Sequence, residues 1–173
     1  MTKASINPPP SPTTKEVSEA KPAAPKRSLT PRRRAREYAL QGVYQSLVVR
    51  RAGSLPNSTA IAKQLAEDPA FKRCQLDLFT GIFEGVLDRT DELEAIITPA
   101  LDRPINELSP VEHAALLIGT YELAADLSVP YKVAINEAVE LAKTFGGTDG
   151  HKYVNGVLDL LAQKLRTAET QAN

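Results

Sequence analysis

The residue types that build most catalytic and metal sites are scarce in this chain. Its 173 residues include one Cys, two His and no Trp, and aromatic residues make up only 5% of the total. The single Cys74 excludes an internal disulfide, and two His residues are too few for a typical histidine metal site. No apolar run approaches the roughly 20 residues that a membrane-spanning helix requires. We therefore expect a protein of the reducing cytoplasm, with no membrane segment and no bound metal or cofactor.

Sequence signatures of catalysis are scarce as well. Glu137 and Glu140 share a predicted helix face, but no His or Cys converges on them. Gly146-Gly147 follows a predicted helix, where Gly residues cap the C-terminus rather than form a phosphate-binding loop. Glu140 and Lys143 have the i, i+3 spacing of a surface ion pair. The sequence thus argues against an enzyme and against a small-molecule substrate.

What the chain does have is an uneven distribution of charge. Lys+Arg and Asp+Glu each number 21, so the formal net charge is zero. Residues 1–36 hold nine basic and two acidic side chains, a balance of +7, and residues 37–173 hold twelve and nineteen, a balance of −7. Arg guanidinium groups match phosphate oxygens and base edges. The basic end therefore predicts an anionic polymer as ligand, and the acidic remainder predicts a basic protein partner.

The sequence divides into a tail and a helical region. Residues 1–29 are rich in Pro, Ala and Ser with almost nothing to bury, and we predict that they form a disordered tail. From Thr30 onward apolar residues recur at helical spacing, with no strand-like alternation. Start signals stand at Thr30-Pro31, at Asp68-Pro69 and at Ser109-Pro110-Val111-Glu112, which forms a capping box.

These patterns predict an all-α fold of about seven helices in two small packed bundles, residues 30–102 and 103–173. The predicted helices cover approximately residues 31–50, 58–67, 69–87, 91–101, 110–126, 131–145 and 151–166. Inside the last of them the helical period continues through Asn155-Gly156. We therefore expect Gly156 to allow close packing between helices.

The basic cluster Arg32-Arg33-Arg34-Ala35-Arg36 opens the first predicted helix. On a helical wheel Arg32, Arg33 and Arg36 lie within about 100° of one another, and Leu40 and Val43 continue the same sector. If that apolar sector packs on the body, the first turns overhang it and present the Arg residues to solvent. A solubilising patch and a processing signal are the alternatives that the composition leaves open.

RNA is favoured over duplex DNA as the ligand of this helix. No helix-turn-helix or finger pattern appears, and single-stranded RNA is typically held by Arg together with stacked aromatic rings. Tyr38, Tyr44 and Tyr153 are possible stacking platforms, although packing in the core or at its boundary is the favoured interpretation of the first two. Asp149, just before the last helix, could cap that helix or accept a hydrogen bond from a base amino group.

Three segments together resemble the NusB transcription antitermination family, and Tyr121-Glu122-Leu123 is a weaker match. The segments are Arg32-Arg33-Arg34-Ala35-Arg36-Glu37 with Ala39-Leu40-Gln41-Gly42-Val43-Tyr44-Gln45, then Val129-Pro130-Tyr131-Lys132-Val133-Ala134-Ile135-Asn136-Glu137-Ala138-Val139-Glu140-Leu141-Ala142-Lys143, and His151-Lys152-Tyr153-Val154-Asn155-Gly156-Val157-Leu158-Asp159. The resemblance covers about residues 31–168 in the order and spacing of the family.

The resemblance implies two packed helical bundles and a non-enzymatic factor. Such factors pair with NusE, a small-subunit ribosomal protein, bind the single-stranded boxA RNA of ribosomal RNA leaders and help RNA polymerase pass terminators. It implies an RNA-binding face made of Arg32, Arg33, Arg36, Gln41, Asp149, Lys152 and Tyr153, and a partner-binding face that includes Glu112 and Tyr131.

The chain departs from the family pattern at three places. The tail before Lys26 is an extension, because family members commonly begin close to the Arg motif. Tyr153 stands where Phe is usual, which keeps a stacking ring and adds a hydroxyl. Leu117 stands where Arg is common, which removes a local partner for Glu122. A second functional hypothesis is a helical protein–protein adaptor or homo-oligomer that does not bind RNA.

Overall fold

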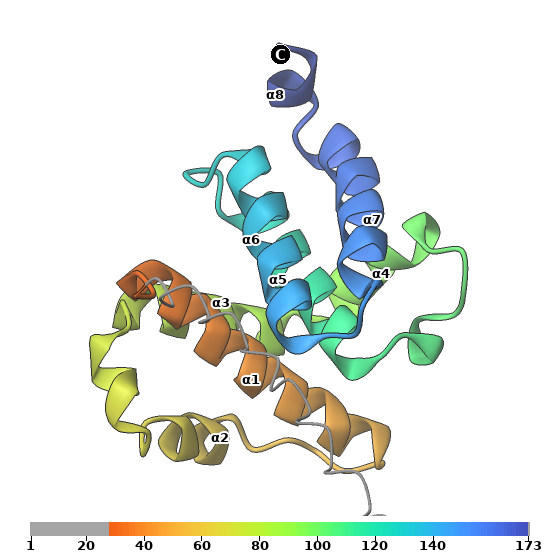
Figure 1. Ribbon diagram of the computed structural model, residues 1–173. Helices are drawn as coiled ribbons and strands as arrows, with labels where there is room; N and C mark the ends of the chain where they lie inside the picture. Colours follow the sequence, from red (N-terminus) through yellow and green to blue (C-terminus); the bar gives the residue numbers. More distant parts are fainter. Residues whose placement is uncertain (1–27, 173) are drawn as a thin grey trace, which may run out of the picture.

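The computed structural model describes residues 28–172, so most of the predicted disordered tail lies outside the described residues. Within this range all regular structure is helical, which confirms the predicted fold class (Figure 1). The α-helices are α1 (Pro31–Arg51), α2 (Ser58–Leu65), α3 (Leu76–Asp88), α4 (Thr90–Ile97), α5 (Pro110–Ala125), α6 (Tyr131–Phe145), α7 (Gly150–Leu165) and α8 (Thr167–Gln171). Short 3-10 turns cover Pro69–Arg73, Thr98–Ala100 and Ile105–Glu107. None of the described helices is both long and apolar enough to cross a membrane.

Local capping explains why α1 and α5 begin where the sequence predicts. The Thr30 hydroxyl accepts a hydrogen bond from the Arg33 N–H at 3.1 Å, and Pro31 occupies the first helical position. Ser109 and Glu112 form the predicted capping box, each side chain accepting from the other residue's N–H at 3.2 Å. These bonds satisfy backbone donors that a helix N-terminus otherwise leaves unpaired.

The third predicted helix begins later than the sequence suggests. Asp68 caps only the 3-10 turn that follows it, by accepting from the Ala70 N–H at 2.9 Å, and α3 starts at Leu76. This turn carries Phe71 between the rings of Tyr38 and Phe79, with centroid separations of 5.0 Å on both sides. Aromatic packing against α1 thus decides the local path of the chain. The last short helix, α8, is not predicted by the sequence.

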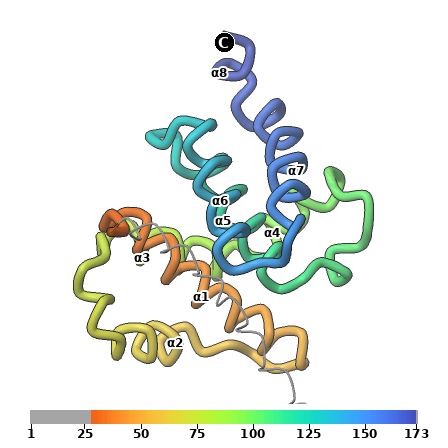
Figure 2. Tube along the Cα trace, viewed as in Figure 1, coloured from red at the N-terminus to blue at the C-terminus, as the bar shows by residue number. Residues whose placement is uncertain are grey.

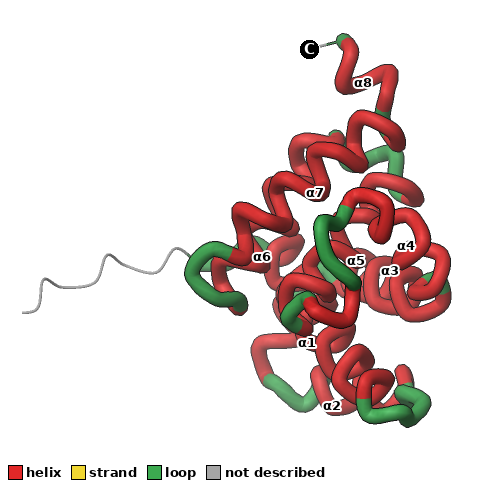
Figure 3. The backbone as a smooth tube through the Cα atoms, turned by 90° about the vertical axis from the view of Figure 1, so that its right-hand side faces the viewer, coloured by secondary structure: helices red, strands yellow, loops and turns green. Residues whose placement is uncertain are grey.

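Helix α5 is the centre of the molecule. It packs against α1, α3 and α4 on one side and against α6 and α7 on the other (Figures 1 and 3). Ten of its sixteen residues are buried, which no amphipathic surface helix would show. In the Cα trace, the orange-to-yellow N-terminal helices lie below the blue C-terminal helices, and the buried side chains of both form one cluster (Figure 2). The division into two bundles at residues 102 and 103 stays a prediction.

The glycines that allow close packing are not the one predicted from the sequence. A Cβ at Gly42 of α1 would lie 2.7 Å from the Phe83 ring and 3.2 Å from Leu65. Phe83 is itself 1% exposed and stacks on Phe79, so it has no room to yield. Gly156 is exposed, and a Cβ there would meet no atom within 4 Å. The prediction that Gly156 is a packing point is therefore wrong.

We expect opposite effects from Ala at these two glycines. Gly42→Ala should lower the free energy of unfolding by about 1–3 kcal/mol, because the added methyl overpacks the contact between α1 and Phe83. Gly156→Ala should raise it by about 0.5–1 kcal/mol, because Ala restricts the unfolded chain without a clash. Urea denaturation followed by circular dichroism measures both. A Gly156→Ala variant as unstable as Gly42→Ala would contradict this assignment.

Candidate RNA and partner interface

The basic residues of α1 differ in what they contact. Arg32 is exposed, and no hydrogen bond or ion pair joins its guanidinium to another residue in the described part of the chain. The Arg33 guanidinium contacts the Glu137 carboxylate of α6 at 3.3 and 3.4 Å and keeps 42% side-chain exposure. This hydrogen bond raises the pKa of Arg33. Arg32 is therefore the residue of the cluster best placed to meet an anionic ligand.

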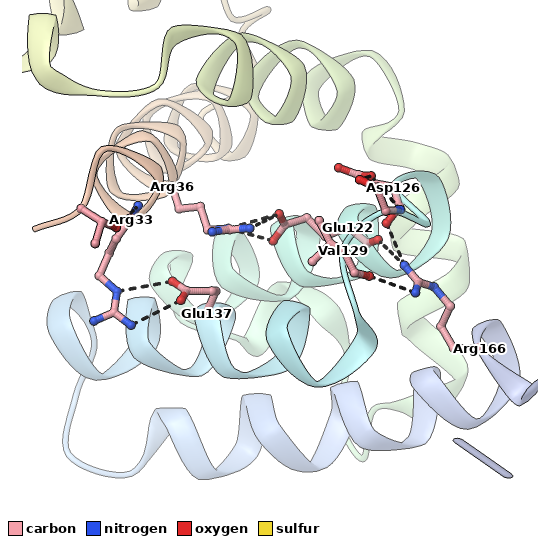
Figure 4. A network of polar contacts seen from close by, with 9 residues as sticks. Arg33, Arg36, Glu122, Asp126, Val129, Glu137 and Arg166 are labelled. Atoms are coloured by element: carbon pink, nitrogen blue, oxygen red, sulfur yellow. Dashed lines mark hydrogen bonds and ion pairs between the residues drawn. The ribbon is translucent and has the colours of Figure 1, made fainter. Parts of the chain in front are cut away.

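Arg36 is buried, contrary to the prediction that it projects into solvent. Its side chain is 3% exposed, and it donates from Nε and Nη2 to the Glu122 carboxylate of α5 at 2.8–3.2 Å (Figure 4). The wheel placed Arg36 in the sector of Leu40 and Val43, and that sector packs on α5. A guanidinium can remain there because the facing carboxylate neutralises it and accepts its N–H groups.

A second buried guanidinium lies close to this ion pair. Arg166, at the end of α7, is 4% exposed and donates to four backbone carbonyls, those of Glu122, Leu123, Asp126 and Val129, at 2.7–3.0 Å. It thereby satisfies the carbonyls at the C-terminal end of α5 and in the turn before α6. Burial raises the pKa of Glu122, and the Arg36 guanidinium opposes that rise. Sequence reasoning named neither Glu122 nor Arg166 as a structural partner of the Arg motif.

Gln41 lies on an apolar groove of about 360 Å³ between α1, α5 and the end of α6. The residues that line it are Leu40, Gln41, Tyr44, Gln45, Val111 and Phe145. Tyr44 and Phe145 are 40% and 38% exposed, so two aromatic rings are offered to a ligand here. Tyr44 is thus not a core residue, whereas Tyr38 is buried and donates to Asp68 at 2.7 Å.

Two of the three remaining predicted RNA-binding residues, Asp149 and Tyr153, lie in a neighbouring cleft. The residues that line this cleft are Arg103, Glu112, Gly147, Thr148, Asp149, Gly150 and Tyr153. Lys152, in the first turn of α7, forms an exposed ion pair with Asp149 at 3.2 Å. The Asp149 side chain makes no capping hydrogen bond to α7, so the expected capping role is not observed.

The two predicted partner-binding residues do not share a surface. Glu112 is in the first turn of α5, beside Asp149 and Tyr153. Tyr131 begins α6, after α5 has ended, and lines a separate polar cleft formed with α7 and α8. The length of α5, about 24 Å for its sixteen residues, separates the two positions. Each therefore belongs to a different candidate interface.

These features define a small protein that is helical throughout its described residues, with a basic first helix and an apolar groove beside it. The NusB family model matches residues 33–163, and the chain belongs to the NusB family. The transcription antitermination protein NusB of Methylobacillus flagellatus is 49% identical over 154 residues, which cover 89% of this chain and 96% of that protein. The protein of the same name from Burkholderia lata is 53% identical over 141 residues, covering 82% and 94%.

Solved structures of the family have the same fold. NusB from T. maritima superimposes with a TM-score of 0.65 at 29% identity, covering 79% of this chain and 94% of its own. A structure of antitermination factors NusB and NusE in complex with dsRNA gives a TM-score of 0.66 at 24% identity, covering 78% and 97%. The family resemblance stated from the sequence is thus confirmed over the Arg-rich helix and the C-terminal helices.

Replacing Arg36 by Ala should unfold the protein more easily. We expect a loss of about 3–5 kcal/mol in the free energy of unfolding, because Glu122 would be left buried and unpaired. The double variant Arg36→Met, Glu122→Leu should recover most of this loss, since it removes both charges and keeps apolar volume. Urea denaturation of both variants makes the comparison. A loss below about 1 kcal/mol for Arg36→Ala, the range of an exposed ion pair, would contradict the structural role.

Proposed function

We propose that this protein is an RNA-binding transcription antitermination factor. With NusE, a small-subunit ribosomal protein, it would bind the single-stranded boxA RNA of ribosomal RNA leaders and help RNA polymerase pass terminators. The observation that carries the proposal is the 49–53% identity to proteins named transcription antitermination protein NusB over more than nine-tenths of their length. A structure of antitermination factors NusB and NusE in complex with dsRNA supports NusE and RNA as the partners.

The proposed RNA path runs from the start of α1 to the start of α7. It begins at Arg32 and Arg33, passes Gln41 about 14 Å along α1, and ends at Asp149, Lys152 and Tyr153. Exposed guanidinium and ammonium groups neutralise phosphates, and an aromatic ring stacks a base. Arg36 is no part of this path, because Glu122 and the surrounding core enclose it. Its role in binding is to hold α1 in place.

The proposed NusE surface is the groove of Leu40, Tyr44, Val111 and Phe145 with Glu112 at its border. Exposed aromatic rings are typical anchors of protein interfaces, and a carboxylate beside them suits a basic ribosomal protein. This surface adjoins the proposed RNA path at Gln41 and at Asp149. Partner and RNA would therefore lie side by side, and each would help to order the other's site. Tyr131 stays a separate candidate at the opposite end of α5.

The proposed protein is a binding factor rather than an enzyme. It would act in the cytoplasm and would have no small-molecule substrate. The relatives that support this proposal carry names of a transcription factor, not of a catalyst. Its contacts to RNA polymerase would be made within the larger antitermination complex.

Binding of a fluorescent, short boxA-type RNA should depend on Arg32 and Lys152. We expect Arg32→Ala and Lys152→Ala each to weaken binding by about tenfold in the presence of NusE and to lower the salt slope by about 0.7, the share of one phosphate in a single strand. Fluorescence anisotropy at several salt concentrations gives both quantities.

The matched control is Lys63→Ala, which removes an exposed charge from α2 at a distance from the proposed path. It should leave affinity and salt slope unchanged. Equal effects of all three variants would mean that only net charge matters. Absence of RNA binding under every condition, with intact NusE binding, would favour the helical adaptor, and a stable homodimer would favour the homo-oligomer.

A further inference from the structure

The loop between α4 and α5 is fastened to the first turn of α7 through Tyr153. The Tyr153 hydroxyl donates to Asp102 Oδ1 at 2.9 Å and lies 3.4 Å from the Asp102 N–H. The neighbouring Arg103 guanidinium lies over the Tyr153 ring, 4.5 Å from its centroid. Its Nε also donates to Asp102 at 2.8 Å. Asp102 thus holds both the ring and the cation that covers it.

We propose that Arg103 is a further RNA-contacting residue, and that Asp102 occupies in the free protein the place that an RNA phosphate takes in the complex. The proposal rests on the proposed RNA-binding function and adds a residue to its site. The sequence gives no signal for it, because Arg103 lies outside the Arg motif, in a loop that joins two helices.

The position of Arg103 suits a ligand contact. It lines the same cleft as Asp149 and Tyr153, and its side chain is 44% exposed. A guanidinium that lies over an aromatic ring still has N–H groups at its edge for hydrogen bonds, and in Arg103 that edge faces Asp102. The outer plane of that guanidinium is a platform on which an RNA base can stack. Tyr153 and Arg103 therefore form a two-layer column that a single-stranded base can extend.

The Asp102 contact is of the kind that a phosphate can replace. The Asp102 side chain is 67% exposed, and hydrogen bonds from Arg103 and Tyr153 lower the pKa of its carboxyl. An ion pair this exposed contributes little to stability, so replacing the Asp102 carboxylate by a phosphate costs little free energy. A phosphate offers the same paired oxygens to the guanidinium fork. The carboxylate keeps Arg103 over the Tyr153 ring until RNA arrives.

A double-mutant cycle with a short single-stranded boxA-type RNA tests this arrangement. In anisotropy titrations with NusE present, Arg103→Ala should weaken binding about tenfold and lower the salt slope by about 0.7. Asp102→Asn should tighten binding about threefold, because it releases the guanidinium. The double variant should bind like Arg103→Ala alone, because Asp102 acts through Arg103. Urea denaturation checks that each variant folds.

The control is Glu107→Gln, which removes one negative charge from the same connection but lies outside the cleft. It should leave the affinity unchanged. If Asp102→Asn tightens binding equally with and without Arg103, the effect is general electrostatics. The proposed replacement of the Asp102 carboxylate by an RNA phosphate is then wrong. If the wild-type protein binds RNA and Arg103→Ala binds equally well, Arg103 is no contact, while the proposed function stands. A wild-type protein that binds no RNA overturns both.

Discussion

The buried ion pair between Arg36 of α1 and Glu122 of α5 determines where the basic end of this molecule lies. Two charges at 3% and 1% side-chain exposure are tolerated only because each satisfies the other. The pair fixes the rotation of α1 about its own axis, so that its apolar side meets α5. It also lies beside Arg166, which holds the last carbonyls of α5 and the turn before α6. Elements far apart in the sequence are thus joined at two buried guanidinium groups.

This constraint gives the residues of the Arg motif different roles. Arg36 is structural, Arg33 is partly neutralised by Glu137, and Arg32 is left for a ligand. The neighbouring cleft of α1 and α6 also contains Glu37 and Glu140. The surface is therefore less cationic than the number of Arg residues suggests. Recognition would depend on a few directed contacts and on the help of a partner, which agrees with the proposal of a factor that works within a complex.

What the sequence predicts well is local. Caps at Thr30 and Ser109 fix two helix starts through bonds to residues three positions away, and apolar periodicity gives α2, α4, α6 and α7 to within a few residues. Aromatic contacts between α1 and the turn at Phe71 override the start signal at Asp68-Pro69, because such contacts depend on residues distant in the sequence.

The candidate site was harder to predict, since it depends on pairs that the chain brings together from far apart. Glu122 follows Arg36 by 86 residues, and no local pattern joins them. The sequence did contain one usable signal, the position of Arg36 four residues before Leu40 on an apolar helix sector, which is typical of a buried residue. The cleft around Tyr153 gathers the predicted Asp149 and Glu112, but its Arg103 comes from a loop without any motif, as does Asp102, which contacts Arg103 and Tyr153.

The most direct test of this account is an NMR titration of the arginine Nε–H resonances with a short single-stranded boxA-type RNA and NusE. The account predicts that the Arg32 resonance shifts on RNA binding, while the Arg36 resonance stays at its free position, because Glu122 continues to hold it. The division between a buried anchor and an exposed contact would be contradicted if the Arg36 resonance shifted as much as that of Arg32. It would also be contradicted if the Arg36 Nε–H were protected from solvent exchange only in the RNA complex.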